Sequence, residues 1–298
     1  MEGASLRALL EENKRPILVE LDPPRQTAFQ PFLQGARDLY LAGADAITVA
    51  DCPIGRASID ASMLSAKLKR EYGVVTLPHM ACRDRNLNAV KALLMGLSME
   101  GVESVLLVTG DPVSHEDRAE VKGVFQMNSR SLARAIRKLS ETGALPSLFL
   151  CGALNVNARN FEKELDKARQ KEESGMEAFL SQPILSARAA ENIRLARQAL
   201  RGYILGGLFP VVSYRNACFL RDNVAGVEMD EEILSSYAGL NREQGEERAR
   251  QVCRDAALRV RDWVDGYYIM TPFQRVELVK SIMLDLRALD GQGGAPCV

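Results

Sequence analysis

The chain has 298 residues, of which 47% are hydrophobic and 26% charged, with a formal net charge of −1. This composition excludes a disordered, collagenous or wholly coiled-coil chain, and the lack of basic excess argues against a nucleic-acid partner. No apolar run reaches the roughly 18 residues that span a bilayer, and residues 1–7 lack the pattern of a secretory signal. We therefore expect a cytoplasmic protein that binds neither membrane nor nucleic acid.

Six cysteines are scattered along the chain, without a C-x-x-C pair. This pattern is typical of reduced thiols rather than a disulfide framework. His79 and Cys82 lie three residues apart, but no second pair of ligands follows. The sequence therefore predicts no metal site.

Short apolar runs alternate with longer helical stretches almost from end to end. Predicted strands lie at 16–21, 46–50, 74–77, 104–108, 147–151, 178–181, 203–205 and 266–270. Their continuous apolar character is typical of parallel strands covered on both faces. Predicted helices include 29–42, 128–140, 161–173, 187–200 and 243–264, with an extra helix at 231–240.

This alternation predicts an α/β fold, a single (β/α)8 TIM barrel over residues 1–298, with the extra helix before the last strand. We expect an N-terminal helix or arm at 1–15 and a disordered tail at 290–298. The alternative is a doubly wound open sheet. That fold more often has a glycine-rich turn after its first strand, where this chain has Asp22-Pro23-Pro24-Arg25.

The active site of such a barrel lies at the carboxyl ends of its strands. Glu20 is the strongest candidate there, because it is a carboxylate inside the apolar run 17–21. Burial should raise the pKa of Glu20 toward neutrality, which suits a general acid. The alternative is a structural ion pair between Glu20 and Arg275.

Three other strand ends carry polar side chains of interest. Asp111 could bind a polar ligand or tune the charge of a cofactor, or it could simply form the turn before Pro112. His79 is a catalyst or a satisfied core histidine. Gln182 could hydrogen-bond a planar heterocycle. The further candidates at strand ends are Asp22, Thr48, Asp51, Arg83, Asp84, Thr109, Asn155, Asn157, Ser213, Tyr214, Thr271, Gln274 and Arg275.

Five segments at these strand ends resemble the methylenetetrahydrofolate reductase family. They are VELDPPR at 19–25, DAITVAD at 45–51, PHMACRDRN at 78–86, VTGDP at 108–112 and SQP at 181–183. The resemblance runs from about residue 16 to 289. It is closest to the reductase half of bifunctional homocysteine S-methyltransferase/methylenetetrahydrofolate reductase proteins, although this chain has no room for the methyltransferase half.

The resemblance implies a flavin-dependent reduction of 5,10-methylenetetrahydrofolate to 5-methyltetrahydrofolate, with the hydride coming from flavin N5. FAD is the expected cofactor, ahead of FMN, with NADH or NADPH as electron donor. Glu20 matches the general acid of the family. Asp111 matches an aspartate beside the flavin and pterin, and Gln182 matches a folate-binding glutamine.

The resemblance also suggests cofactor contacts. Thr48 and His79 match flavin contacts, Lys171 matches a basic residue near the flavin phosphate or ribityl chain, and Glu164 falls where a ribose-binding aspartate is usual. The full predicted site is Glu20 and Asp111 as catalytic residues; Gln182, Asp111 and Arg275 for substrate; and Thr48, His79, Thr109, Asp111, Asn155, Arg159, Glu164 and Lys171 for cofactor.

The chain departs from the family pattern at several of these positions. Thr109 stands where bacterial reductases carry an arginine, and Gln170 stands where a basic flavin contact is expected. The loop 153–160 lacks the usual proline and histidine, so Arg159 is a candidate for the missing phosphate charge. The charged segment 114–126 is either a lid over the adenine side or a solvated loop.

Two other functions remain open. One is a pterin-binding methyltransferase, which would need no flavin and no buried acid. The other is an accessory barrel subunit that takes electrons from a partner protein. The sequence leaves open a homo-oligomer and a separate methyltransferase partner.

Overall fold

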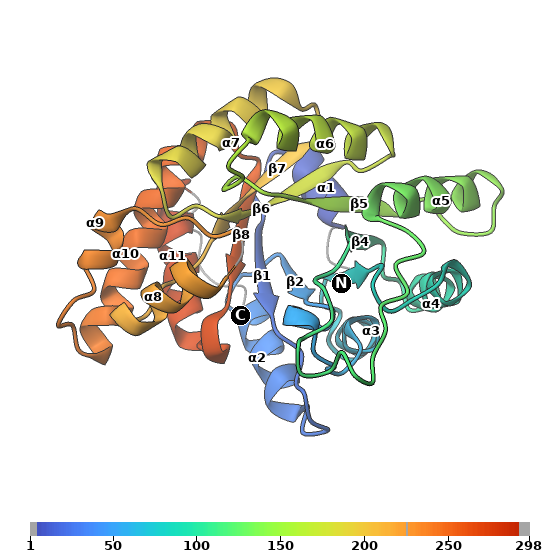
Figure 1. Cartoon of the computed structure of the whole chain (residues 1–298), viewed down its shortest axis with the longest axis horizontal. Helices are drawn as coiled ribbons and strands as arrows, with labels where there is room; N and C mark the ends of the chain where they lie inside the picture. Colours follow the sequence, from blue (N-terminus) through green and yellow to red (C-terminus); the bar gives the residue numbers. More distant parts are fainter. Residues whose placement is uncertain (1–4, 225, 292–298) are drawn as a thin grey trace.

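A computed structural model of the chain describes residues 5–224 and 226–291. The described residues contain eight parallel strands that pair in sequence order and close into a barrel (Figure 1). The strands are β1 (Ile17–Leu21), β2 (Ala46–Val49), β3 (Thr76–Ala81), β4 (Ser104–Val108), β5 (Phe149–Leu154), β6 (Ala178–Pro183), β7 (Tyr203–Leu208) and β8 (Gly266–Met270). The predicted (β/α)8 barrel is therefore confirmed.

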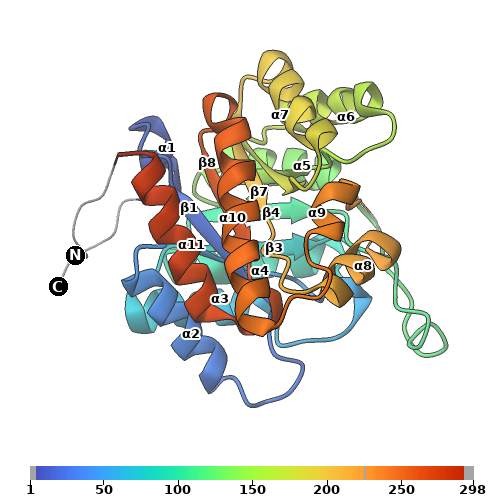
Figure 2. The same ribbon diagram turned by 90° about the vertical axis from the view of Figure 1, so that its left-hand side faces the viewer.

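Helices surround this barrel, and α10 and α11 lie side by side on one flank (Figure 2). The α-helices are α1 (Leu6–Glu11), α2 (Gln30–Leu41), α3 (Ala61–Tyr72), α4 (Leu87–Met99), α5 (Ser129–Glu141), α6 (Phe161–Glu173), α7 (Ala187–Ala199), α8 (Tyr214–Asn223), α9 (Glu231–Ser235), α10 (Arg242–Val260) and α11 (Val276–Leu289). Short 3-10 turns are η1 (Pro53–Gly55), η2 (Arg261–Trp263) and η3 (Pro272–Gln274). Within the described residues, every helix is too short or too polar to cross a bilayer.

Alternate residues of each strand face opposite sides of the barrel wall. Leu18, Ala46, Leu77 and Leu106 belong to the inner cluster of buried side chains. Their strand neighbours, such as Val19 and Ile47, join the larger cluster beneath the helices. Continuing the inner alternation toward the carboxyl ends brings polar residues into the barrel lumen, which is how the fold positions the site.

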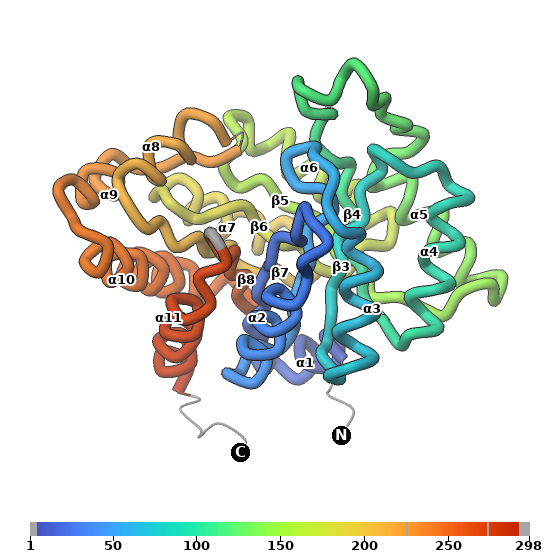
Figure 3. Tube along the Cα trace, turned by 90° about the horizontal axis from the view of Figure 1, so that it is seen from below, coloured from blue at the N-terminus to red at the C-terminus, as the bar shows by residue number. Residues whose placement is uncertain are grey.

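Helix α1 closes the opposite, amino end of the barrel. Leu6 and Leu10 are each 1% exposed and belong to the same inner cluster as Leu18. Ser5 caps this short helix by accepting a hydrogen bond from the backbone N–H of Ala8. Figure 3 shows α1 at one end of the barrel and the long segment after β4 projecting at the other.

Strand β3 is longer than predicted. The predicted strand ended at Leu77, before Pro78, and proline cannot donate a ladder hydrogen bond. The ladder nevertheless continues past Pro78, pairing His79 with Leu106 and Ala81 with Val108. His79 therefore lies on a strand and faces the lumen rather than standing in a loop.

The crossover between β7 and β8 holds two helices besides α10, where one was predicted. Helix α8 was missed; it begins at Ser213, whose hydroxyl accepts a hydrogen bond from the N–H of Asn216. Helix α9 stops at Ser235, short of the predicted end at residue 240.

The predicted disordered tail begins at Asp290, but this residue is held by ion pairs with Arg15 and Arg261. Residues 292–298 lie outside the described residues.

Candidate active site at the carboxyl end of the barrel

A cavity of about 400 Å³ opens at the carboxyl ends of the strands, and we call it the mouth cavity. Four predicted site residues line it: Glu20, His79, Asp111 and Gln182. The remaining lining residues are Asp22, Ala50, Asp51, Pro53, Leu106, Val108, Gly110, Ala153, Leu180, Ser181, Tyr268 and Met270. The fold thus brings together side chains from seven different strands or their following loops.

Glu20 points into the lumen from β1. Burial raises its pKa to about 7, and a hydrogen bond from the Tyr268 hydroxyl to Oε2 opposes this rise. The upward direction agrees with the prediction from the apolar strand. The alternative pairing of Glu20 with Arg275 is wrong, because the Arg275 guanidinium binds Glu246 on α10 instead.

His79 contacts the same carboxylate. Its Nε2 lies 3.3 Å from Oε2 of Glu20. Burial lowers the pKa of His79 to about 4, against the pull of Asp51 and Asp22. The imidazole is therefore neutral at pH 7, and this contact is not an ion pair. Within the described residues, His79 Nε2 and the neighbouring Thr48 Oγ1 are buried without a hydrogen-bond partner.

Asp22 follows Glu20 by two residues and lines the same cavity. Its desolvation and the nearby charge of Glu20 raise its pKa to about 6, while His79 and Arg25 oppose the rise. The mouth cavity thus holds two carboxyl groups that titrate near neutral pH. Such perturbed groups in a cleft are typical of functional sites.

Asp111 is held in place through its backbone. Arg83, only 2% exposed, donates to the carbonyl oxygen of Asp111 at 3.1 Å and to the carboxylate of Asp84. Gly110 has φ +94°, and an added Cβ would lie 3.1 Å from the Arg83 side chain. The turn before Asp111 therefore needs glycine, and Arg83 fixes the loop that presents the carboxylate.

Gln182 lies on β6 with its side chain toward the mouth cavity. The local backbone is tied down by Ser181, whose hydroxyl accepts from the N–H of Gly207 at 2.7 Å. An added Cβ at Gly207 would lie 2.4 Å from the carbonyl oxygen of Ser181. The close approach of β6 and β7 therefore depends on this glycine.

A second cavity, of about 340 Å³, adjoins the mouth cavity, and we call it the side groove. The two share Val108 and Ala153 as lining residues. Three predicted cofactor residues line the side groove: Thr109, Glu164 and Lys171. The Lys171 ammonium donates to the carbonyl of Ala153 at 2.5 Å, and burial lowers its pKa.

The side groove favours an anionic ligand. It is lined by three cations (Arg130, Lys167 and Lys171) and one carboxylate (Glu164), which gives a formal charge of +2. The first turn of α5 also lies in its wall. The backbone N–H groups and positive dipole end of such a turn attract phosphates.

Three other predicted residues lie elsewhere. Asn155 and Arg159 line a separate cavity of about 640 Å³, bounded by Arg188 and Arg221, and it shares no lining residue with the mouth cavity or side groove. Arg275 is absent from the lining of the mouth cavity and is paired with Glu246. These three residues are not brought together with Glu20.

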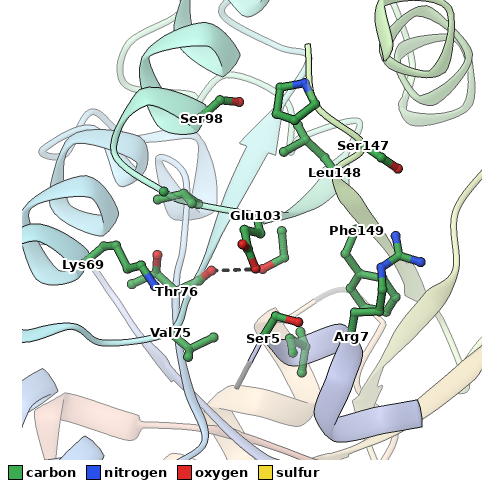
Figure 4. A pocket seen from close by; sticks show the side chains of 15 residues that line it. Ser5, Arg7, Lys69, Val75, Thr76, Ser98, Glu103, Ser147, Leu148 and Phe149 are labelled. Carbon is green, nitrogen blue, oxygen red and sulfur yellow. Dashed lines mark hydrogen bonds between the residues drawn. The ribbon is translucent and has the colours of Figure 1, made fainter. Parts of the chain in front are cut away.

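The opposite end of the barrel has a cavity of about 620 Å³, between α1 and the amino ends of β3, β4 and β5 (Figure 4). Arg7, Thr76 and Glu103 are among its lining residues, and none of the predicted site residues is. Features at the amino end of β/α barrels generally serve stability rather than chemistry.

Two residues with clear roles in this geometry were missed from the sequence. The sequence pattern predicts Tyr268 only as part of an apolar strand. It places Arg83 at a strand end but predicts no role for it. A signal existed for Tyr268, since β8 neighbours β1 in a closed barrel and a buried tyrosine hydroxyl needs a partner. No comparable signal existed for Arg83, whose partners come from three separate loops.

Comparisons with known proteins give a family for most of the chain. Residues 5–264 match the model of the family described as "Methylenetetrahydrofolate reductase". No curated protein matches the chain.

Two solved structures are similar in fold. One is a Clostridium thermocellum protein described as binding two copies of 5-methyl-5,6,7,8-tetrahydrofolic acid, with TM-score 0.68, 13% identity, and coverage of 95% of this chain and 98% of that one. The other is 2,3-dimethylmalate lyase of the PEP mutase/isocitrate lyase superfamily, with TM-score 0.54, 14% identity, and coverage of 98% and 88%. At these identities the likenesses concern the fold alone.

Proposed function

The chain belongs to the methylenetetrahydrofolate reductase family, and we propose that it reduces 5,10-methylenetetrahydrofolate to 5-methyltetrahydrofolate with a bound flavin. The observation that carries the proposal is Glu20, a half-buried carboxyl group in the mouth cavity whose desolvation raises its pKa to about 7. Asp111 and Gln182 line the same cavity. An acid, a carboxylate and an amide are the groups that this reaction needs around a pterin.

Glu20 is the proposed general acid. A carboxyl group with a pKa near 7 is about half protonated at pH 7 and gives up its proton readily, which is the condition for efficient acid catalysis. Its proton would go to the folate nitrogen that leaves when the five-membered ring opens. This exposes the one-carbon unit as an iminium ion.

Asp111 and Gln182 are proposed to orient the pterin. A carboxylate accepts hydrogen bonds from amino and ring N–H groups, and an amide both donates and accepts. The fixed backbone around each residue supports this role, because Arg83 holds the Asp111 loop and Gly207 allows the close strand approach beside Gln182. Both side chains are therefore presented from rigid supports.

The residues of the two cavities fit a flavin. His79 lines the mouth cavity, and Thr48 pairs with Glu20 on the neighbouring strand; Nε2 of His79 and Oγ1 of Thr48 are buried without a hydrogen-bond partner within the described residues. The side groove contains Lys171 and carries a formal charge of +2, which supports binding of a phosphate or diphosphate. Glu164 lines the same groove and is proposed to accept a hydrogen bond from a ribose or ribityl hydroxyl. A bound reduced flavin would supply the hydride that turns the one-carbon unit into a methyl group.

FAD is the proposed form, ahead of FMN, and NADH or NADPH is the proposed donor. The cations at Arg130 and Lys167 offset the absence of arginine at Thr109, which supports a diphosphate. From the resemblance of the sequence to the reductase half of bifunctional proteins, we also propose a separate methyltransferase partner that would consume the methyl group.

The test is the visible spectrum of the purified protein, followed by anaerobic NADH and then methylenetetrahydrofolate. The proposal requires a flavin spectrum that bleaches with NADH and recovers with the folate. A flavin that ignores NADH but is reoxidised by folate after chemical reduction would indicate a partner protein as donor. A protein that binds neither FAD nor FMN would overturn the proposal in favour of a folate-binding methyltransferase or accessory subunit.

A further inference from the structure

We propose that Tyr268 is a positioning residue that holds Oε2 of Glu20 and thereby leaves Oε1 as the oxygen that delivers the proton to folate. This inference rests on the proposed function and adds to it a residue that the sequence pattern did not single out. It starts from one contact between neighbouring strands. The Tyr268 hydroxyl on β8 donates to Oε2 of Glu20 on β1.

The second contact concerns the same oxygen. His79 Nε2, on β3, lies 3.3 Å from Oε2. Groups from two other strands therefore crowd Oε2. Within the described residues, no group hydrogen-bonds Oε1, while the Glu20 side chain remains 18% exposed and lines the mouth cavity.

The chemistry of a carboxylic acid then assigns the proton. A neutral carboxyl group has one hydroxyl oxygen and one oxygen that only accepts. An oxygen that accepts the tyrosine O–H is the accepting one, so the carboxyl proton resides on Oε1. Burial and the nearby Glu20 charge keep the pKa of Tyr268 well above its usual value, so the phenol remains a donor at all working pH values.

The hydrogen bond from Tyr268 matters for the ionisation of Glu20, because the mouth cavity has no lysine or arginine in its lining within the described residues. The titratable groups facing Glu20 are His79 from β3, Asp22 from the end of β1, Asp51 from the end of β2, Asp111 from the loop after β4 and Tyr268 from β8. Since the others are acids or a neutral imidazole, Tyr268 is the group in this set that stabilises the ionised form of Glu20.

The test compares Tyr268→Phe with Tyr267→Phe. Tyr267 is the adjacent tyrosine, whose ring belongs to the cluster beneath the helices, so its variant makes the same chemical change on the other face of β8. In Tyr268→Phe, we expect NADH to reduce the flavin at the wild-type rate and the folate half-reaction to slow about tenfold or more. The pH at which the folate half-reaction falls to half should rise by about one unit, because the ionised carboxylate has lost a donor. Tyr267→Phe should change none of these.

A second measurement needs neither flavin nor folate. The carboxyl stretch of Glu20, identified by infrared difference between wild type and Glu20→Gln, can be titrated in the apoprotein. Tyr268→Phe should shift both its frequency and its titration midpoint upward. An unchanged frequency and midpoint would overturn the proposed contact, and an unchanged folate half-reaction with a shifted midpoint would overturn its role in proton delivery.

Failure of the proposed function has a different signature. In that case the wild-type protein itself shows no folate half-reaction, whatever the infrared titration gives, and the role of Tyr268 in proton delivery falls with it. Loss of the half-reaction confined to Tyr268→Phe, with wild type and Tyr267→Phe active, supports the positioning role.

Discussion

Oε2 of Glu20 lies 3.3 Å from Nε2 of His79, and both side chains are uncharged in the folded protein at pH 5.5. Burial raises the pKa of Glu20 from 4.5 to about 7 and lowers that of His79 from 6.5 to about 4. At pH 5.5 the folded pair carries one proton, on Glu20, and the unfolded pair also carries one, on the histidine. Since the proton counts match, this pair contributes almost no pH dependence to the free energy of unfolding.

Replacing either residue should reveal the pH dependence of the free energy of unfolding that the other residue contributes, because the two contributions cancel in the wild type. Glu20→Gln leaves His79, whose depressed pKa makes the protein more stable as pH rises from about 4 to 6.5. His79→Gln leaves Glu20, whose raised pKa makes the protein less stable as pH rises from about 4.5 to 7. Each effect should approach about 3 kcal/mol over its full range. Urea unfolding of wild type and both variants between pH 4.5 and 6.5 checks this; parallel curves for the two variants would contradict it.

Glu20→Gln should separate the two halves of the proposed reaction. Glutamine keeps the size of the side chain but has no proton to give, so the folate half-reaction should fall by about 10²- to 10⁴-fold. Flavin reduction by NADH should continue, because it needs no acid at this position. Stopped-flow absorbance of each half-reaction provides the measurement. Survival of both would mean that Glu20 is structural.

Lys171→Met should weaken binding of flavins that carry phosphate. The ammonium is buried in the side groove beside Glu164, and its removal should raise the Kd for FAD and FMN by about tenfold. Riboflavin, which has no phosphate, should bind the variant and wild type equally. Flavin fluorescence quenching measures all three. The control is Arg169→Met on the same helix, where the guanidinium pairs with Asp166 at the surface.

Equal losses for riboflavin and FAD in Lys171→Met would contradict the phosphate role. They would point instead to collapse of the groove around the Ala153 carbonyl, which accepts from the Lys171 ammonium at 2.5 Å.

Arg83→Met should destabilise the protein and displace Asp111. The guanidinium is buried and donates to Asp84 and to the carbonyl oxygens of Asp111 and Cys52. Its loss should reduce the free energy of unfolding by about 3 kcal/mol and raise the KM for folate. Urea unfolding and steady-state kinetics report the two effects.

Arg56→Met is the matched control for this change. Arg56 also bridges the loops after β2 and β4, through Glu116, but both side chains are exposed. Its loss should cost less than about 1 kcal/mol. Equal effects of the two substitutions would show that Arg83 has no special part in holding the Asp111 loop.

The barrel was predictable because each strand is apolar on both faces and is followed by a polar or proline-containing turn. The positions of Glu20 and His79 at strand ends likewise predicted one shared site, and His79 proved to lie on β3 itself. Arg275 could not be placed this way: its partner Glu246 belongs to a helix about thirty positions earlier, and nothing in the local pattern chooses Glu246 over Glu20. Asn155 and Arg159 line a different cavity for a related reason, since a loop can turn away from the strand end that precedes it.

Strand β1 is completed on one side by β8, and this pairing joins residues that are 248 positions apart, Glu20 and Tyr268. During translation Glu20 emerges long before Tyr268. A nascent or truncated chain therefore carries a glutamate without its phenol partner or its buried setting, and it has an ordinary acidity. The acid with its raised pKa forms only after β8 has been made, so chains that stop before β8 cannot carry out the proposed chemistry.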